Sequence, residues 1–94
     1  MDIVVRRVID SFIKKHPDGK GSVKAWYYEA KQALWNNPMD IKQQYANASF
    51  LADNIVIFNI KGNGYRLVTK IAYNTKKVFI KWIGTHAEYN KKKF

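Results

Sequence analysis

Hydrophobic residues near the start of the chain recur with the period of a helix. Between residues 6 and 16 they fall on one face of an ideal helix, and they are Val8, Ile9, Phe12 and Ile13. We therefore expect a helix over residues 6–16, preceded by a short β-branched segment, residues 2–5, that suits a strand. Pro17, followed by Asp18-Gly19, predicts the end of this helix.

A second hydrophobic stripe predicts another helix immediately downstream. Ser22 suits its N-cap, because a serine hydroxyl accepts a hydrogen bond from a backbone N–H exposed at the start of a helix. Asn36-Asn37-Pro38 predicts the end of this helix. The stripe repeats at helical spacing and consists of Val23, Trp26, Tyr27, Ala30 and Leu34.

The second half of the chain favours strands. Residues 38–53 come first and show no clear period, so we expect a loop that crosses the molecule. The alternatives are a helical turn over residues 40–45 and the start of a strand at residues 52–54. After this loop, β-branched and aromatic residues dominate three runs bounded by turn signals. These runs are residues 55–60, 65–73 and 78–83.

Short turns join the three runs. Asn63-Gly64 is a strong hairpin signal, residues 74–77 form the next turn, and Gly84 is expected to end the last strand. Consecutive strands joined in this way make an antiparallel meander. The sequence thus predicts one α+β domain over residues 1–94. In it, two N-terminal helices pack on a small antiparallel sheet, and residues 86–94 add a short helical segment or a loose end.

Alternation within the predicted sheet indicates that one of its faces is at least partly open. Arg66 and Lys70 fall on the same face of the second run. Two cations cannot be buried in an apolar core without partners. Lys81 joins them if the register of the third run allows it, which the sequence does not determine. The third run alternates Val78, Ile80 and Trp82 with Phe79, Lys81 and Ile83.

Charge is concentrated in the last third of the chain. The formal net charge is +10 over 94 residues. Residues 1–60 contain eight basic and six acidic residues, whereas residues 61–94 contain nine basic residues and one acid, Glu88. Such a surface favours a polyanionic partner, nucleic acid above all. The alternatives are an acidic protein, a membrane surface, or a lysine-rich face that is merely solvated.

Composition argues against several other classes of protein. Without cysteine there is no disulfide or thiolate metal site, and two histidines argue against structural zinc. No apolar run is long enough to cross a membrane, and the first residues lack a secretory signal. We therefore expect a cytoplasmic protein without membrane association, metal or other cofactor.

Two segments resemble a known protein family. Residues 59–68 contain the pattern Gly-x-x-Tyr-Arg-Leu-Val, and residues 78–89 end in Gly-Thr-His-x-x-Tyr. With the order of helices and strands, these segments resemble the HigB family of toxins in the RelE-like superfamily. The resemblance implies a RelE-like fold and a metal-independent endoribonuclease that cleaves mRNA, usually in the A site of the translating ribosome. It also implies a cognate helix-turn-helix antitoxin (HigA-like), through which alone the toxin reaches operator DNA.

Metal-independent RNA cleavage defines the chemistry of the expected site. The 2′-hydroxyl attacks the adjacent phosphorus and leaves a 2′,3′-cyclic phosphate, assisted by a base, an acid and a cation that stabilises the phosphorane. The resemblance assigns the cation to Arg66, whose alternative role is a surface ion pair. His86 stands where the superfamily usually has arginine, and either serves phosphate binding and proton transfer or is a surface or capping residue. Tyr89 either stacks on a base and assists proton transfer or packs the tail onto the sheet.

Four lysines are candidate phosphate contacts, each of which is otherwise a solvated side chain. Lys61 is placed to replace the basic residue that the superfamily has at the position of Asn59. The tail residues either add affinity for ribosomal RNA or have no role in binding, and they are Lys91, Lys92, Lys93 and Phe94. The runner-up function is a non-catalytic RNA- or ribosome-binding module, which needs the same charge but no chemistry at His86. The four lysines are Lys61, Lys70, Lys81 and Lys91.

The three tryptophans fit either the core or a contact with the antitoxin. They are Trp26, Trp35 and Trp82.

Overall fold

Five strands form one sheet in the computed structural model, which describes residues 1–62 and 64–92. They are β1 (Asp2–Val4), β2 (Ser49–Phe50), β3 (Ile55–Ile60), β4 (Tyr65–Ala72) and β5 (Lys77–Thr85), in the order β1-β5-β4-β3-β2. The three consecutive strands β3, β4 and β5 pair antiparallel, which confirms the predicted meander. β1 runs parallel to β5, so the sheet is mixed and not wholly antiparallel. Side-chain alternation is the same in both strand directions, so the sequence could not reveal this pairing.

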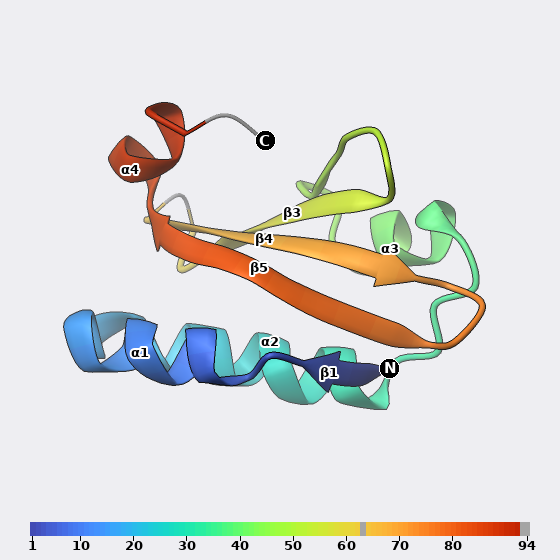
Figure 1. The fold of residues 1–94 in the computed structure, drawn as a ribbon, viewed down its shortest axis with the longest axis horizontal. Coiled ribbons are helices and arrows are strands. Elements are labelled where there is room, and N and C mark those ends of the chain that lie inside the picture. Colours follow the sequence, from blue (N-terminus) through green and yellow to red (C-terminus); the bar gives the residue numbers. More distant parts are fainter. Residues whose placement is uncertain (63, 93–94) are drawn as a thin grey trace.

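The two longest helices lie on one side of this sheet. The helices are α1 (Arg7–Lys15), α2 (Lys20–Gln32), α3 (Pro38–Gln44) and α4 (His86–Asn90). In Figure 1, α1 and α2 lie along one side of the sheet, whereas α4 projects from the end of β5 on the opposite side. The predicted α+β arrangement of two N-terminal helices, a meander and a short C-terminal helical segment is therefore confirmed. Among the described residues, no helix is long and apolar enough to cross a membrane.

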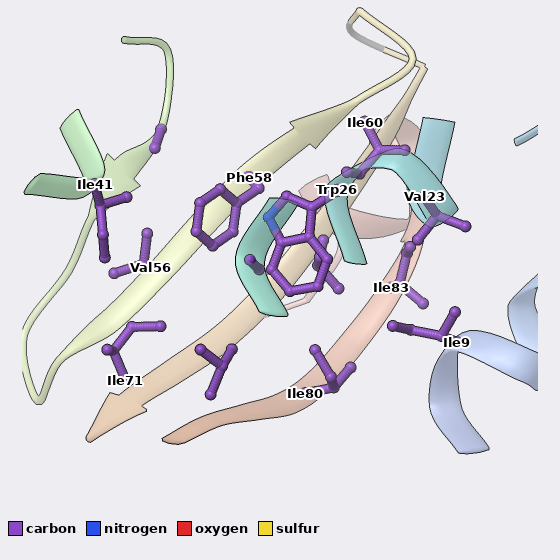
Figure 2. Close-up of a cluster of buried hydrophobic side chains, with 14 of the residues drawn as sticks. Ile9, Val23, Trp26, Ile41, Val56, Phe58, Ile60, Ile71, Ile80 and Ile83 are labelled. Carbon is purple, nitrogen blue, oxygen red and sulfur yellow. The ribbon is translucent and has the colours of Figure 1, made fainter. Parts of the chain in front are cut away.

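The core fills the space between the α1–α2 layer and the sheet. The ring of Phe58 on β3 lies 5.2 Å from that of Trp26, measured between centroids (Figure 2). It stacks on Trp35 at 5.9 Å. Trp26 and Trp35 are each only 2% exposed, so both are core residues. Truncation of one buried aromatic residue to alanine typically lowers the free energy of unfolding by about 3–5 kcal/mol. We expect a loss on that scale for any one of these three rings.

The boundaries of α2 differ from those predicted. A 3₁₀ turn over Pro17–Gly19 leads directly into α2, so Ser22 lies inside the helix and is not its N-cap. The cap position belongs to Gly19, whose backbone N–H donates to the His16 carbonyl oxygen. At the other end the backbone becomes extended at Ala33, which leaves Leu34 72% exposed. Leu34 therefore does not belong to the buried stripe.

The expected loop over residues 38–53 contains two regular elements. α3 begins after Asn37, whose side-chain oxygen accepts a hydrogen bond from the Asp40 backbone N–H at 3.0 Å. Its Ile41 is completely buried, and β2 pairs with β3 at residues 49–50. A seven-residue helix with one buried side chain is too short to show a hydrophobic period.

An irregularity in β5 corrects the predicted alternation. Val68 pairs with Trp82 but Thr69 pairs with Ile80, so Lys81 is an extra residue without a partner in the ladder. The insertion puts Ile83 in the core cluster with Ile80 (Figure 2). Trp82, which pairs with Val68 and contacts Tyr89, lies on the opposite face. β5 then continues through Gly84, which does not end the strand as expected.

Candidate functional site

Arg66 lies near the end of β4 on the sheet face opposite α1 and α2. Its register partners are Asn59 on β3 and Gly84 on β5. Beside it, Val68 is fully buried, whereas Arg66 is half-buried and Lys70 is exposed on the same face. The prediction that this face is partly open to solvent is therefore confirmed.

The guanidinium of Arg66 is held by neighbours on two sides. Its Nη1 donates a hydrogen bond of 2.7 Å to Oδ1 of Asn59. Its Cζ lies 5.4 Å from the centre of the Tyr89 ring, within the range of a cation–π contact. Its Nε is buried and has no hydrogen-bond partner in the described part of the chain. Arg66 is thus positioned by a polar and an aromatic contact, and it has no carboxylate partner within residues 1–62 and 64–92.

α4 carries the other two predicted catalytic residues. Thr85 and Glu88 form a capping box, in which each side chain accepts the backbone N–H of the other residue. The Thr85 backbone N–H stabilises the Glu88 carboxylate and lowers its pKa. His86 is the first residue of the helix, and its backbone N–H donates to the Gly64 carbonyl oxygen at 3.3 Å. His86 and Tyr89 are three residues apart on α4 and therefore share a side of it.

Trp82 and Lys92 extend the same group of side chains. The Trp82 ring lies 6.4 Å from the Tyr89 ring, and the Lys92 Nζ lies 5.5 Å from the Trp82 ring centre. The structure therefore brings Arg66 and Tyr89 together with Trp82, Lys92 and Asn59. The last three were not among the residues that the sequence predicted for the catalytic site. Trp82 reaches this face only because of the irregularity in β5, and Lys92 joins the group through Trp82, so the sequence pattern could not reveal either of them. The register of the β3–β4 hairpin alone places Asn59 opposite Arg66.

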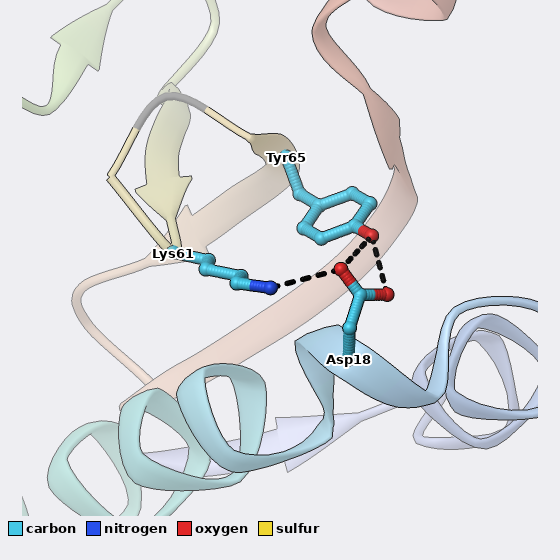
Figure 3. A network of polar contacts seen from close by, with 3 residues as sticks. All are labelled: Asp18, Lys61 and Tyr65. Atoms are coloured by element: carbon cyan, nitrogen blue, oxygen red, sulfur yellow. Dashed lines mark hydrogen bonds and ion pairs between the residues drawn. The ribbon is translucent and has the colours of Figure 1, made fainter.

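Lys61 lies elsewhere, in a polar cluster with the helical layer. Its Nζ is 2.9 Å from Oδ2 of Asp18, and the Tyr65 hydroxyl donates to both carboxylate oxygens at 2.7 and 2.8 Å (Figure 3). The hydrogen bond from Lys61, and then that from Tyr65, lowers the pKa of Asp18. The same contact with Asp18 raises the pKa of Tyr65. Lys61 is therefore engaged by a carboxylate and is not gathered around Arg66.

The other predicted lysines are distributed around the sheet. Lys70 is exposed on the Arg66 face, four residues along β4, or about 13 Å for an extended strand. Lys81 lines a groove of about 360 Å³ against α1, together with Arg7 and Lys15. Lys91 is exposed at the end of α4. The tail residues Lys93 and Phe94 and the turn residue Asn63 lie outside the described residues.

A helix-covered sheet with Arg66 on its other face and a short terminal helix beside it defines a RelE-like domain. The family model described as "RelE-like toxic component of a toxin-antitoxin system" (HigB toxin) matches residues 19–92. The chain therefore belongs to the HigB toxin family.

Relatives with related names match nearly the full length of the chain. The mRNA interferase HigB of Escherichia coli O6:H1 is 23% identical over 93 residues, which cover 97% of this chain and 90% of the relative. The mRNA interferase toxin HigB of Escherichia coli K12 is 24% identical over 93 residues, or 96% of this chain and 88% of the relative. The mRNA interferase HigB of Shigella flexneri matches with the same values.

Proposed function

We propose that this protein is an endoribonuclease toxin that cleaves mRNA in the cytoplasm, on the translating ribosome. The observation that supports it most directly is the orientation of Arg66 by Asn59 and Tyr89 on a sheet face with no nearby acid partner among the described residues. Relatives that match nearly the whole chain are named mRNA interferases, which agrees with this reaction. Membership of a toxin–antitoxin family supplies the biological context.

Cleavage requires no covalent intermediate with the protein. The RNA 2′-oxygen forms a bond to the adjacent phosphorus, the bond from phosphorus to the 5′-oxygen breaks, and a 2′,3′-cyclic phosphate remains. The 2′-hydroxyl proton goes to a base, and the leaving 5′-oxygen receives a proton from an acid. Arg66 stabilises the doubly negative phosphorane, because its planar guanidinium offers paired donors to two phosphate oxygens. In this scheme the guanidinium supplies the positive charge that a metal would otherwise supply.

His86 and Tyr89 are the proposed proton carriers. Both lie on α4, three residues apart, and Tyr89 contacts Arg66 directly. A histidine can accept or donate a proton near neutral pH. Tyr89 additionally offers a ring on which a base stacks. This division of roles is supported by the placement of both residues on one side of α4 and by the contact of Tyr89 with Arg66.

Lysines supply the remaining attraction for RNA. Lys70 lies on the Arg66 face, Lys81 at the edge near α1, and Lys91 after α4, so each is proposed to contact the backbone of the message or of the ribosome. Lys61 retains this role only if RNA displaces it from Asp18. A HigA-like helix-turn-helix antitoxin is the proposed inhibitor, and operator DNA is contacted through it.

Cleavage of a defined mRNA in a reconstituted translation reaction tests the proposal. The wild-type protein should yield fragments ending in 2′,3′-cyclic phosphate. Arg66→Ala should reduce cleavage by at least about a hundredfold, a typical loss when one transition-state donor is removed. Arg6→Ala removes an exposed arginine from the other layer and should cleave normally. An intact message with blocked translation would instead identify a non-catalytic RNA- or ribosome-binding module.

A further inference from the structure

A second hollow lies directly beside the Arg66 site. It has a volume of about 280 Å³ and adjoins β3, the end of α3 and the β3–β4 turn. Asn59 is part of its wall and is also the hydrogen-bond acceptor of Arg66. The hollow is lined by Gln44, Tyr45, Ala46, Asn47, Asn59 and Gly62.

The chemistry of this hollow differs from that of the surrounding surface. Its lining contains three side-chain amides and no charged residue, whereas the lining of the groove near α1 includes three cations, Arg7, Lys15 and Lys81, and one acid, Glu88. Cations are the strongest partners of phosphate, whereas side-chain amides, which also contact phosphate, are the common readers of base edges. An amide presents a donor and an acceptor side by side, which matches the paired groups on a nucleobase edge.

Two of these amides are already oriented by the protein. Oδ1 of Asn59 accepts from Arg66, and its Nδ2 donates to the Asn47 carbonyl oxygen at 3.2 Å. Oε1 of Gln44 accepts from Nε1 of Trp35 at 3.1 Å. The NH₂ group of Gln44 and the side-chain amide of Asn47 have no hydrogen-bond partner in the described part of the chain, and both residues are exposed. The hollow therefore has fixed walls and unused hydrogen-bonding groups.

We propose that this amide hollow binds the base of a nucleotide adjacent to the scissile phosphate and reads its hydrogen-bonding edge. The inference rests on the proposed function, because it requires RNA on the Arg66 face. Asn59 touches both the hollow and Arg66, so the phosphate at Arg66 and the base in the hollow belong to neighbouring nucleotides. Gln44 and Asn47 make the contacts that distinguish one base from another, and the protein prefers that base at one flanking position.

The test uses a set of mRNAs that are identical except at the positions flanking the main cleavage site. Each position carries all four bases in turn, and cleavage rates are measured in the translation reaction. The wild-type protein should prefer one base at one position by about tenfold, the discrimination of one good amide–base contact. Asn47→Ala and Gln44→Met should flatten this preference while slowing the disfavoured sequences by less than about threefold. Gln43→Met changes an exposed neighbour outside the hollow and should preserve the preference.

Asn47→Ala should fold normally, because Asn59 is bound by the backbone carbonyl of Asn47, which the substitution keeps. An unchanged base profile in both variants would overturn the inference. So would equal slowing of all sequences, or a wild-type protein that cleaves them all alike. If the wild-type protein cleaves none of them, the proposed function fails first and the inference fails with it.

Discussion

Arg66 and Asn59 are joined across the β3–β4 hairpin by a hydrogen bond of 2.7 Å between the guanidinium and the amide oxygen. Asn59 is in turn anchored to the Asn47 carbonyl oxygen in the segment between α3 and β2. The arginine is therefore held by a chain of contacts that begins outside its own strand. Orientation of a guanidinium before the substrate arrives lowers the entropic cost of forming its hydrogen bonds to phosphate.

Asn59→Ala should slow RNA cleavage by about tenfold, the scale of one hydrogen bond to a charged group. The reason is that Arg66 loses the acceptor that orients it. Added to Arg66→Ala, the same substitution should have little further effect on the residual single-turnover rate, because residues that act through one another are not additive. Independent, multiplying effects in the double variant would show that Asn59 does not act through Arg66.

His86→Gln should change how the cleavage rate depends on pH. A histidine ring can accept or donate a proton in the reaction, whereas a glutamine amide cannot. We expect a slower rate and a flatter profile between pH 6 and 8, measured with the chemical step rate-limiting. Parallel profiles for the two proteins would remove His86 from proton transfer and leave it a role in phosphate binding alone.

Asp18→Asn should destabilise the protein in a pH-dependent way. Contacts with Lys61 and Tyr65 lower the pKa of Asp18 in the folded state. Such a carboxylate stabilises the fold above its unfolded pKa of about 4, and this contribution is lost as the pH falls through the folded value. The melting temperature of Asp18→Asn should therefore lie below that of the wild type at pH 7. The difference should begin to narrow below about pH 4 and disappear as the pH falls through the lower folded pKa.

The control for this measurement is Asp10→Asn. Asp10 is exposed on α1 and lies 3.9 Å from Arg6, a surface pair that contributes little. A gap for Asp18→Asn that stays constant from pH 7 to pH 3 would mean that the charge of Asp18 is not what stabilises the fold.

Gly84→Ala should destabilise the fold by about 1–3 kcal/mol, the usual cost of overpacking. An added β-carbon would lie 2.5 Å from Cζ2 of Trp82 and 2.8 Å from Oε1 of Glu88. Gly21→Ala is the matched control, because a β-carbon there meets nothing within 4 Å. It lies in α2, where alanine is favoured over glycine by up to about 1 kcal/mol. Urea unfolding should move the two midpoints in opposite directions, and equal shifts would contradict the packing around Gly84.

Much of the fold could be predicted from the chain because its periodic segments are long. The α1 stripe was predicted from periodicity, and its Ile9 and Phe12 are buried as expected. α3 was predicted only as an alternative helical turn over residues 40–45, because Ile41 alone is buried in it. The direction of β1 was missed because a pleat looks the same in parallel and antiparallel pairs.

The candidate site was predictable only in part. Alternation along β4 placed Arg66 and Lys70 on one face, since that strand is regular. Trp82 was grouped with Val78 and Ile80, which face the core, because the alternation of apolar and polar residues does not reveal one extra residue in a strand. Lys61 looked like a free cation, since its partner Asp18 is 43 positions away in the sequence. Whether the predicted residues act on RNA remains a prediction that the experiments above test.

The extra residue at Lys81 separates β5 into two stretches with opposite phase. Before the extra residue the even-numbered side chains, Val78 and Ile80, face the core, whereas after it the odd-numbered Ile83 does. Deleting Lys81 would remove the irregularity and leave Trp82 opposite Val68 and Ile83 opposite Leu67, so both side chains would keep their present faces. The end of β5 that pairs with β1 keeps its own phase in either case. Comparisons between relatives and redesigns of this strand should therefore treat its two stretches as independent units of sequence variation.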